Sequence, residues 1–126
     1  MGAIIGRLSF EAEEILARTV VDQMLDASVR HPVTARTVFA APGIALGWCG
    51  LPSTESRGAK RNDAAPAIGT NDNRTVRVVA DACLTNAGEL RTTLERDGHR
   101  FPTCSDEELI AHAYDHWGTR AFELSQ

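Results

Sequence analysis

The sequence lacks the features that mark several large classes of protein. It has no run of basic residues, and its formal net charge is −4, so we do not expect a nucleic-acid-binding surface. No apolar stretch approaches the length that crosses a membrane. The apolar start from Met1 to Gly6 is too short for a signal peptide and has no basic lead. These absences favour a protein of the cytoplasm.

Cysteine is also scarce, with Cys49, Cys83 and Cys104 at wide spacings. An odd number of cysteines without a CxxC pair predicts neither a disulfide framework nor a metal site of that kind, so we expect three reduced thiols. No cofactor is predicted. What is present is a normal globular balance, with 43% hydrophobic and 24% charged residues. A length of 126 residues suits a single domain over residues 1–126.

The first third of the chain predicts a strand and a helix. Residues 3–8 are apolar and β-branched, which is typical of a buried strand. Nothing interrupts a helix from residue 10 to about residue 29, and Pro32 stops it. The core-facing stripe of this helix is predicted at helical spacing: Ala17, Val21, Met24, Leu25 and Ser28.

Short strands and turns are expected in the middle of the chain. The strand-like runs are residues 37–40, 44–48, 66–69 and 76–80. Pro42-Gly43 separates the first two and predicts a hairpin, while Thr70 to Asn73 predicts a tight turn. Residues 52–63 have no periodicity, which predicts a surface loop.

Two helices with start and stop signals are predicted near the end. The first begins at Asn86, which forms a capping-box pattern with Glu89, and ends at Gly98. The second repeats this pattern from Ser105 to Gly118. Its buried face is predicted to comprise Leu109, Ile110, Ala113, Tyr114 and Trp117. The order of elements indicates an α+β fold with mainly antiparallel sheet.

Residues 78–118 carry a series of short motifs. They are Val79-Ala80-Asp81, Asn86, Glu89-Leu90-Arg91, Gly98-His99, Arg100-Phe101, Ser105-Asp106 and Tyr114 to Gly118. In order and spacing they resemble the class II glutamine amidotransferase domain of asparagine synthetase-like proteins. The resemblance implies an Ntn-hydrolase-like fold of layered antiparallel sheets and helices, in a partial or compact version. It also implies that the chain ends before the family's next strand.

The same resemblance implies glutamine hydrolysis, in which an N-terminal Cys thiol is the nucleophile and its own α-amine is the base. Gly2 stands at the position of that Cys. Gly50 stands where the family has the Arg that binds the glutamine carboxylate. Asp81 and Ala82 stand at the Asn and Gly of the oxyanion hole. Asp106, the acid that binds the substrate amine, is kept.

We therefore predict no catalytic residue and lean against an enzyme. The predicted role is a scaffold or substrate-holding domain for an ATP-dependent amide-forming synthetase, as a homodimer or in complex with an adenylating synthetase partner. One alternative is an active glutamine-hydrolysing domain that supplies ammonia to an asparagine synthetase. The other is a binding module for a small amine or amino acid, which reuses a residual substrate pocket of Gly50, Asp81, Ala82 and Asp106.

The acids of this pocket also have structural interpretations. Asp106 would occupy the first position of a helix, where any acid is favourable. Asp81 follows a strand and would cap the next turn. Asn86 is expected to act as a helix cap.

Cysteine and histidine offer two further candidate sites. Cys83 would be a nucleophile only beside a base such as His31 or His99, and a packed, inert thiol is expected instead. His112 and His116 share a helix face as a metal pair would, but no third ligand is evident. We expect surface histidines near a helix C-terminus, and no metal site is predicted.

Overall fold

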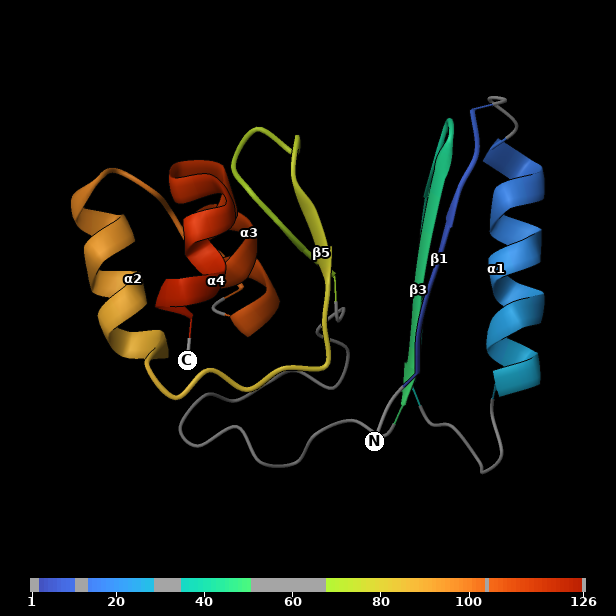
Figure 1. The fold of residues 1–126 in the computed structure, drawn as a ribbon, viewed down its shortest axis with the longest axis horizontal. Coiled ribbons are helices and arrows are strands. Elements are labelled where there is room, and N and C mark those ends of the chain that lie inside the picture. The colour runs from blue at the N-terminus through green and yellow to red at the C-terminus, as the bar shows by residue number, and fades with distance from the viewer. Residues whose placement is uncertain (1–2, 11–13, 29–34, 51–67, 104, 126) are drawn as a thin grey trace. The chain divides into compact units, whose positions relative to one another are not determined.

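The chain divides into two compact units, Met1–Ala67 and Ile68–Gln126. The computed structural model describes residues 3–10, 14–28, 35–50, 68–103 and 105–125, so the predicted surface loop at 52–63 lies outside the described residues. Helices combine with antiparallel sheets in the chain, which confirms the α+β class (Figure 1). Organisation as a single domain stays a prediction. Among the described helices, none has both the length and the apolar character needed to cross a bilayer.

The first unit is a three-stranded antiparallel sheet with one helix against it (Figure 1). Its elements are β1 (Ala3–Leu8), α1 (Glu14–Ser28), β2 (Ala35–Ala41) and β3 (Ile44–Gly50). β3 lies in the centre of the order β1-β3-β2. The predicted hairpin is confirmed, and Gly43 supplies the positive φ of 83° that its turn requires.

One face of α1 packs on the central strand. Val21 and Leu25 of α1 meet Ala45 and Cys49 of β3 in a buried cluster. Gly47 permits this close packing, because a Cβ there would lie 2.6 Å from Val21 Cγ1. The predicted stripe was right for Val21 and Leu25. It was wrong for Met24, which is 42% exposed, and for Ser28, which is also exposed.

The second unit combines a short hairpin with helices. Its elements are β4 (Ile68–Thr70), β5 (Arg77–Val79), α2 (Ala87–Arg96), α3 (Asp106–Trp117), a 3₁₀ turn (Gly118–Arg120) and α4 (Ala121–Leu124). β4 and β5 pair in antiparallel register. The buried core joins all three helices through Leu90, Leu94, Leu109, Ala113 and Ala121. Tyr114, which we predicted in the buried face of α3, is exposed.

Asn71 organises the turn between β4 and β5. Its buried side-chain oxygen accepts hydrogen bonds from the backbone N–H of Thr75 at 2.9 Å and of Val76 at 3.0 Å. Its amide nitrogen donates to Thr75 Oγ1 at 2.9 Å. The predicted turn is therefore present. Its left-handed residue is Arg74, with φ of 57°, rather than an Asn or Asp.

The helix caps confirm one sequence prediction and correct another. Ser105 Oγ accepts a hydrogen bond from Glu108 N at 3.2 Å and caps α3 as predicted. The Asn86 side chain makes no capping hydrogen bond to α2. Its Nδ2 donates to the carbonyl of Leu124 at 2.6 Å, so the Asn86 side chain is bonded to the end of α4 rather than to the first turn of α2.

Candidate functional site

Asp106 links the start of α3 to the segment that follows β5. It is the first residue of the helix, as predicted, and its side chain is half-buried. Its Oδ2 accepts a hydrogen bond from the backbone N–H of Leu84 at 3.0 Å. Asp81 and Ala82 precede Leu84 in the same segment and are exposed. The structure thus joins Asp106 to the segment that contains Asp81 and Ala82. That these three residues share one pocket stays a prediction.

The other predicted pocket residues lie elsewhere in the chain. Gly50 is the buried last residue of β3 in the first unit and pairs with Ala35 of β2. Gly2 lies outside the described residues. The grouping of Gly2 and Gly50 with Asp81, Ala82 and Asp106 in one pocket therefore stays a prediction.

The described part of the predicted pocket is rich in hydrogen-bond acceptors. An ionised carboxylate accepts hydrogen bonds and has none to donate. Asp81 in that state would not stabilise a developing oxyanion, which needs donors. Asp106 already accepts a backbone hydrogen bond. The chemistry available here is the binding of N–H groups, from the protein or from a positively charged ligand.

A second acid holds the loop before α3. Glu108 is buried, and its Oε2 accepts hydrogen bonds from Thr103 N at 3.1 Å and Thr103 Oγ1 at 2.8 Å. In a capping box this side chain would bond the backbone N–H of Ser105. The Glu108 side chain bonds Thr103, two residues before Ser105. It thereby fixes the loop that leads into α3, next to Asp106.

Gly69 lets β4 lie directly on the first turn of α3. A Cβ at this position would overlap the backbone of Glu107. A larger residue would therefore have to move strand and helix apart. Gly69 keeps the β4–β5 hairpin in place beside the helix start that carries Asp106.

The structure corrects the prediction for Cys83, which is exposed rather than packed. Of its two candidate bases, His31 lies outside the described residues. His99 uses both ring nitrogens in contacts with other histidines, at 2.9 Å to His112 Nδ1 and 3.2 Å to His116 Nδ1. This arrangement argues against a Cys83–His99 nucleophile.

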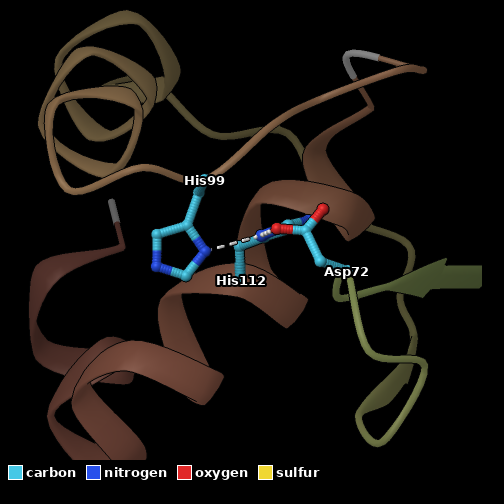
Figure 2. A group of neighbouring side chains, drawn as sticks. All are labelled: Asp72, His99 and His112. Atoms are coloured by element: carbon cyan, nitrogen blue, oxygen red, sulfur yellow. Dashed lines mark hydrogen bonds and ion pairs between the residues drawn. The ribbon is translucent and has the colours of Figure 1, made fainter.

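The histidines form a connected cluster in the second unit. His99 Nδ1 lies 2.9 Å from His112 Nδ1, and Figure 2 shows these two rings with Asp72 beside them. His112 Nδ1 lies 4.0 Å from Asp72 Oδ2. His116 links His99 to Asp97, whose Oδ2 lies 3.3 Å from His116 Nε2. Residues from two turns and one helix therefore meet here.

The environment of His112 differs from the predicted one. Its side chain is 1% exposed, so the expectation of a surface histidine was wrong for this residue. Burial lowers the pKa of His112, and the neighbouring His99 adds to this effect, while the carboxylates of Asp72, Glu108 and Asp115 oppose it. His116 is exposed, as predicted.

The sequence did not predict that Asp72 and His99 belong to this cluster. It predicted Asp72 as a turn residue and His99 as the residue that follows a helix stop signal. Periodicity relates residues within one element, and these two reach His112 from a different turn and a different helix end. The sequence feature that could have indicated the cluster is the presence of three histidines within 18 positions, from His99 to His116. This feature does not identify the carboxylate that joins them.

Comparisons with known proteins agree with the motif pattern. The family model described as a glutamine amidotransferase domain matches residues 56–125, which is more than half of the chain. The chain is also 24% identical over 117 residues to asparagine synthetase 3 (glutamine-hydrolyzing) of Bacillus subtilis strain 168. That alignment covers 93% of this chain and 18% of that protein. The family match includes Asp81, Ala82 and Asp106, and it does not include Gly2 or Gly50.

Proposed function

The chain belongs to the glutamine amidotransferase domains of the asparagine synthetase type, and from this premise we propose that it does not hydrolyse glutamine. In the proposed role it is a scaffold or substrate-holding domain for an ATP-dependent amide-forming synthetase. We further propose that it acts in the cytoplasm, either as a homodimer or bound to an adenylating synthetase.

The observation that carries the proposal is the hydrogen bond between Leu84 N and Asp106 Oδ2 at 3.0 Å. Asp106 is the acid that the family resemblance assigns to the substrate amine. In this chain one of its oxygens holds the backbone of the segment after β5. This hydrogen bond is useful to the fold whether or not glutamine binds. The presence of Asp106 at the family position is therefore explained without glutamine hydrolysis.

The residues at the other family positions support the same conclusion. Gly2 has no thiol, and Gly50 has no guanidinium to pair with a carboxylate. Asp81 replaces a neutral amide donor by an acceptor. Loss of the nucleophile alone lowers the rate of a hydrolase with a comparable catalytic triad by about 10⁴- to 10⁶-fold. The combined replacements therefore favour a non-catalytic role.

A glutaminase assay tests the proposal directly. The full chain is incubated with saturating glutamine, and released glutamate and ammonia are measured, with the Bacillus subtilis relative as a positive control. We expect no release above that of the buffer. Turnover that disappears in Asp106→Asn or Cys83→Ser, both still folded by circular dichroism, would overturn the non-catalytic assignment.

The partner is tested separately. Light scattering after size-exclusion chromatography at high concentration measures the mass of the particle. A chain of 13.6 kDa that stays monomeric, and that does not co-elute with an adenylating synthetase encoded beside it, would argue against the scaffold role. A dimer or a stable complex would support it.

One observation favours a second candidate function, the binding of a small amine. Asp81 is exposed and Asp106 is half-buried, and the Leu84–Asp106 hydrogen bond brings their segments together. Two carboxylates, with Gly50 at the position of the family's arginine, would select a cation over an anion. Glutamine and simple amines that leave the melting temperature unchanged, in both the wild type and Asp81→Asn, would argue against this candidate.

A further inference from the structure

Asp72, His99 and His112 present three metal-ligating atoms to one point in the second unit. One oxygen of Asp72 and one nitrogen of each histidine all lie within 4.8 Å of one another (Figure 2). We propose that these three side chains bind a divalent transition-metal ion of the Zn²⁺ class. The site is independent of the proposed scaffold role and of the residues at the glutamine positions.

The distances between the ligand atoms are close to those of a tetrahedral site. Zn–N and Zn–O bonds of 2.0–2.1 Å place neighbouring ligand atoms about 3.3 Å apart. His99 Nδ1 and His112 Nδ1 are 2.9 Å apart, and His112 Nδ1 and Asp72 Oδ2 are 4.0 Å apart. These two separations therefore change by less than about 1 Å on binding, and that between His99 and Asp72, which is at most 4.8 Å, changes by up to about 1.5 Å. Asp72 provides that movement, because its side chain is 48% exposed on a turn.

His99 has the hydrogen-bond support that metal-binding imidazoles usually have. When Nδ1 of a histidine binds a metal, its Nε2–H commonly donates to a carboxylate, carbonyl or water. Here His99 Nε2 lies 3.2 Å from His116 Nδ1, and His116 Nε2 lies 3.3 Å from Asp97 Oδ2. When His116 Nε2–H donates to Asp97, His116 Nδ1 is free to accept from His99 Nε2–H, and the lone pair of His99 is then on Nδ1.

The three ligands are held by local structure that exists without an ion. His112 is buried in the middle of α3. His99 follows the left-handed Gly98, and its backbone N–H donates to the carbonyl of Leu94 at 3.0 Å, which fixes the chain after α2. Asp72 follows Asn71, whose side chain organises the β4–β5 turn. An ion would therefore meet ligands that are already close to their binding positions.

The donor set selects the class of ion. Two imidazoles and one carboxylate suit Zn²⁺, Co²⁺, Ni²⁺ or Cu²⁺, whereas Mg²⁺ and Ca²⁺ prefer oxygen ligands alone. Three protein ligands leave the fourth position of a tetrahedral Zn²⁺ open to water. The bound ion would connect the β4–β5 turn to α3 and to the end of α2.

The test is a titration with ZnCl₂ by isothermal calorimetry, with Cys83→Ser and Cys104→Ser in the background so that thiols do not bind the ion. We expect one Zn²⁺ per chain and a higher melting temperature with Zn²⁺ than with EDTA. Asp72→Asn and His99→Gln each lower the affinity at least tenfold. MgCl₂ is expected to leave the melting temperature unchanged.

The matched control is Glu123→Gln, which removes the same charge from an exposed acid of the same unit. It is expected to keep the wild-type affinity within twofold. His116→Gln should weaken binding less than His99→Gln, because His116 acts through His99. Absence of Zn²⁺ binding, or equal affinity in Asp72→Asn, His99→Gln and Glu123→Gln, with each variant folded by circular dichroism, would overturn the metal site.

Discussion

The two units of the chain are built in contrasting ways. In the first, α1 and the sheet meet through aliphatic side chains and Cys49, and among its described residues the ion pairs join Arg36 to Asp22 and Asp26. In the second, an aliphatic core is accompanied by buried polar side chains. They are Asn71, Ser105, Glu107, Glu108 and His112. Among the described residues, all of the buried polar and charged side chains belong to the second unit.

The two kinds of interior constrain the structure to different degrees. An aliphatic core fixes which surfaces meet, but it tolerates substitutions of similar volume. Buried polar groups must be hydrogen-bonded, and each one specifies its partners. The second unit is therefore the part whose geometry is most closely specified, and it also carries Asp81, Asp106 and the histidine cluster. The two tryptophans, Trp48 in β3 and Trp117 in α3, permit each unit to be followed by fluorescence.

The largest expected effects come from the two aliphatic cores. Leu25→Ala and Leu94→Ala each remove a fully buried side chain and should destabilise by about 2–5 kcal/mol. Chemical denaturation of single-tryptophan versions measures which unit responds. If the units unfold independently, Leu25→Ala shifts only the Trp48 signal and Leu94→Ala only the Trp117 signal. Coincident shifts of both signals would show one cooperative transition.

Gly69→Ala should destabilise the second unit by about 3 kcal/mol, which is the upper end of the usual cost of overpacking. The cost is high because the new Cβ would meet backbone atoms rather than a movable side chain. Gly88→Ala is the matched control, because a Cβ there meets nothing within 4 Å. The control should be neutral or stabilising by up to about 1 kcal/mol, as expected for alanine in a helix. Equal stability of the two variants in urea would contradict the close packing of β4 on α3.

Asn71→Ala removes the side chain that holds the β4–β5 turn and should destabilise by about 1–3 kcal/mol. The backbone N–H groups of Thr75 and Val76 lose their acceptor, and the Asn71 side chain that provides it is itself buried. Asn73→Ala, at an exposed position of the same turn, is the control and should change stability much less. The melting temperature followed through Trp117 distinguishes the two, and a larger loss in Asn73→Ala would refute the assigned role of Asn71.

His112 should make the second unit less stable in mild acid. Burial lowers its pKa in the folded state below the ordinary 6.5, so the unfolded chain takes up a proton first as the pH falls. The free energy of unfolding is therefore expected to fall with pH from about 6.5 down to the folded-state pKa, and to level off below it. Denaturation in EDTA from pH 7.5 to 5 measures this slope. His112→Asn should flatten it, and an unchanged slope would contradict the prediction.

The smallest effect is expected at the surface of the first unit. Arg36 pairs with Asp26 at 2.9 Å and with Asp22 at 3.6 Å, and each of the three side chains is at least 39% exposed. Asp26→Asn should destabilise by about 0.5 kcal/mol and should lose that effect in high salt. A loss of several kcal/mol, seen through Trp48 at high salt, would mean that the first unit also depends on a specific polar contact.

The sequence predicted the elements better than their contacts. β1, the β2–β3 hairpin, α2 and α3 follow from periodicity and from glycine and proline punctuation, and all of them are present. Some misses concerned exposure, as for Met24, Tyr114 and Cys83, and others occurred where a side chain had a distant partner. The Asn86 amide bonds Leu124, 38 positions away, and local capping patterns carry no information on such a contact.

For the candidate site too, the sequence predicted the family and the local position of a residue but not its distant contact. The motif pattern between residues 78 and 118 pointed to the amidotransferase family, and the match over residues 56–125 confirms that family. Asp106 was placed at the first turn of a helix, where it lies. Its bond to Leu84, 22 positions earlier, was not predicted, because it depends on how the end of β5 approaches the helix.

Local preferences of the amino acids thus set where helices, strands and turns begin and end, since these preferences act over four or five residues. The assignment of Gly2, Gly50, Asp81, Ala82 and Asp106 to the family's glutamine positions also came from order and spacing, and it stays a prediction. Only the packed structure decided that Asp106 supports a backbone segment, that His112 is buried, and that Asp72 and His99 meet it. Those contacts join residues 13 to 40 positions apart, and the packing of the helices and the hairpin against one another brings them within reach.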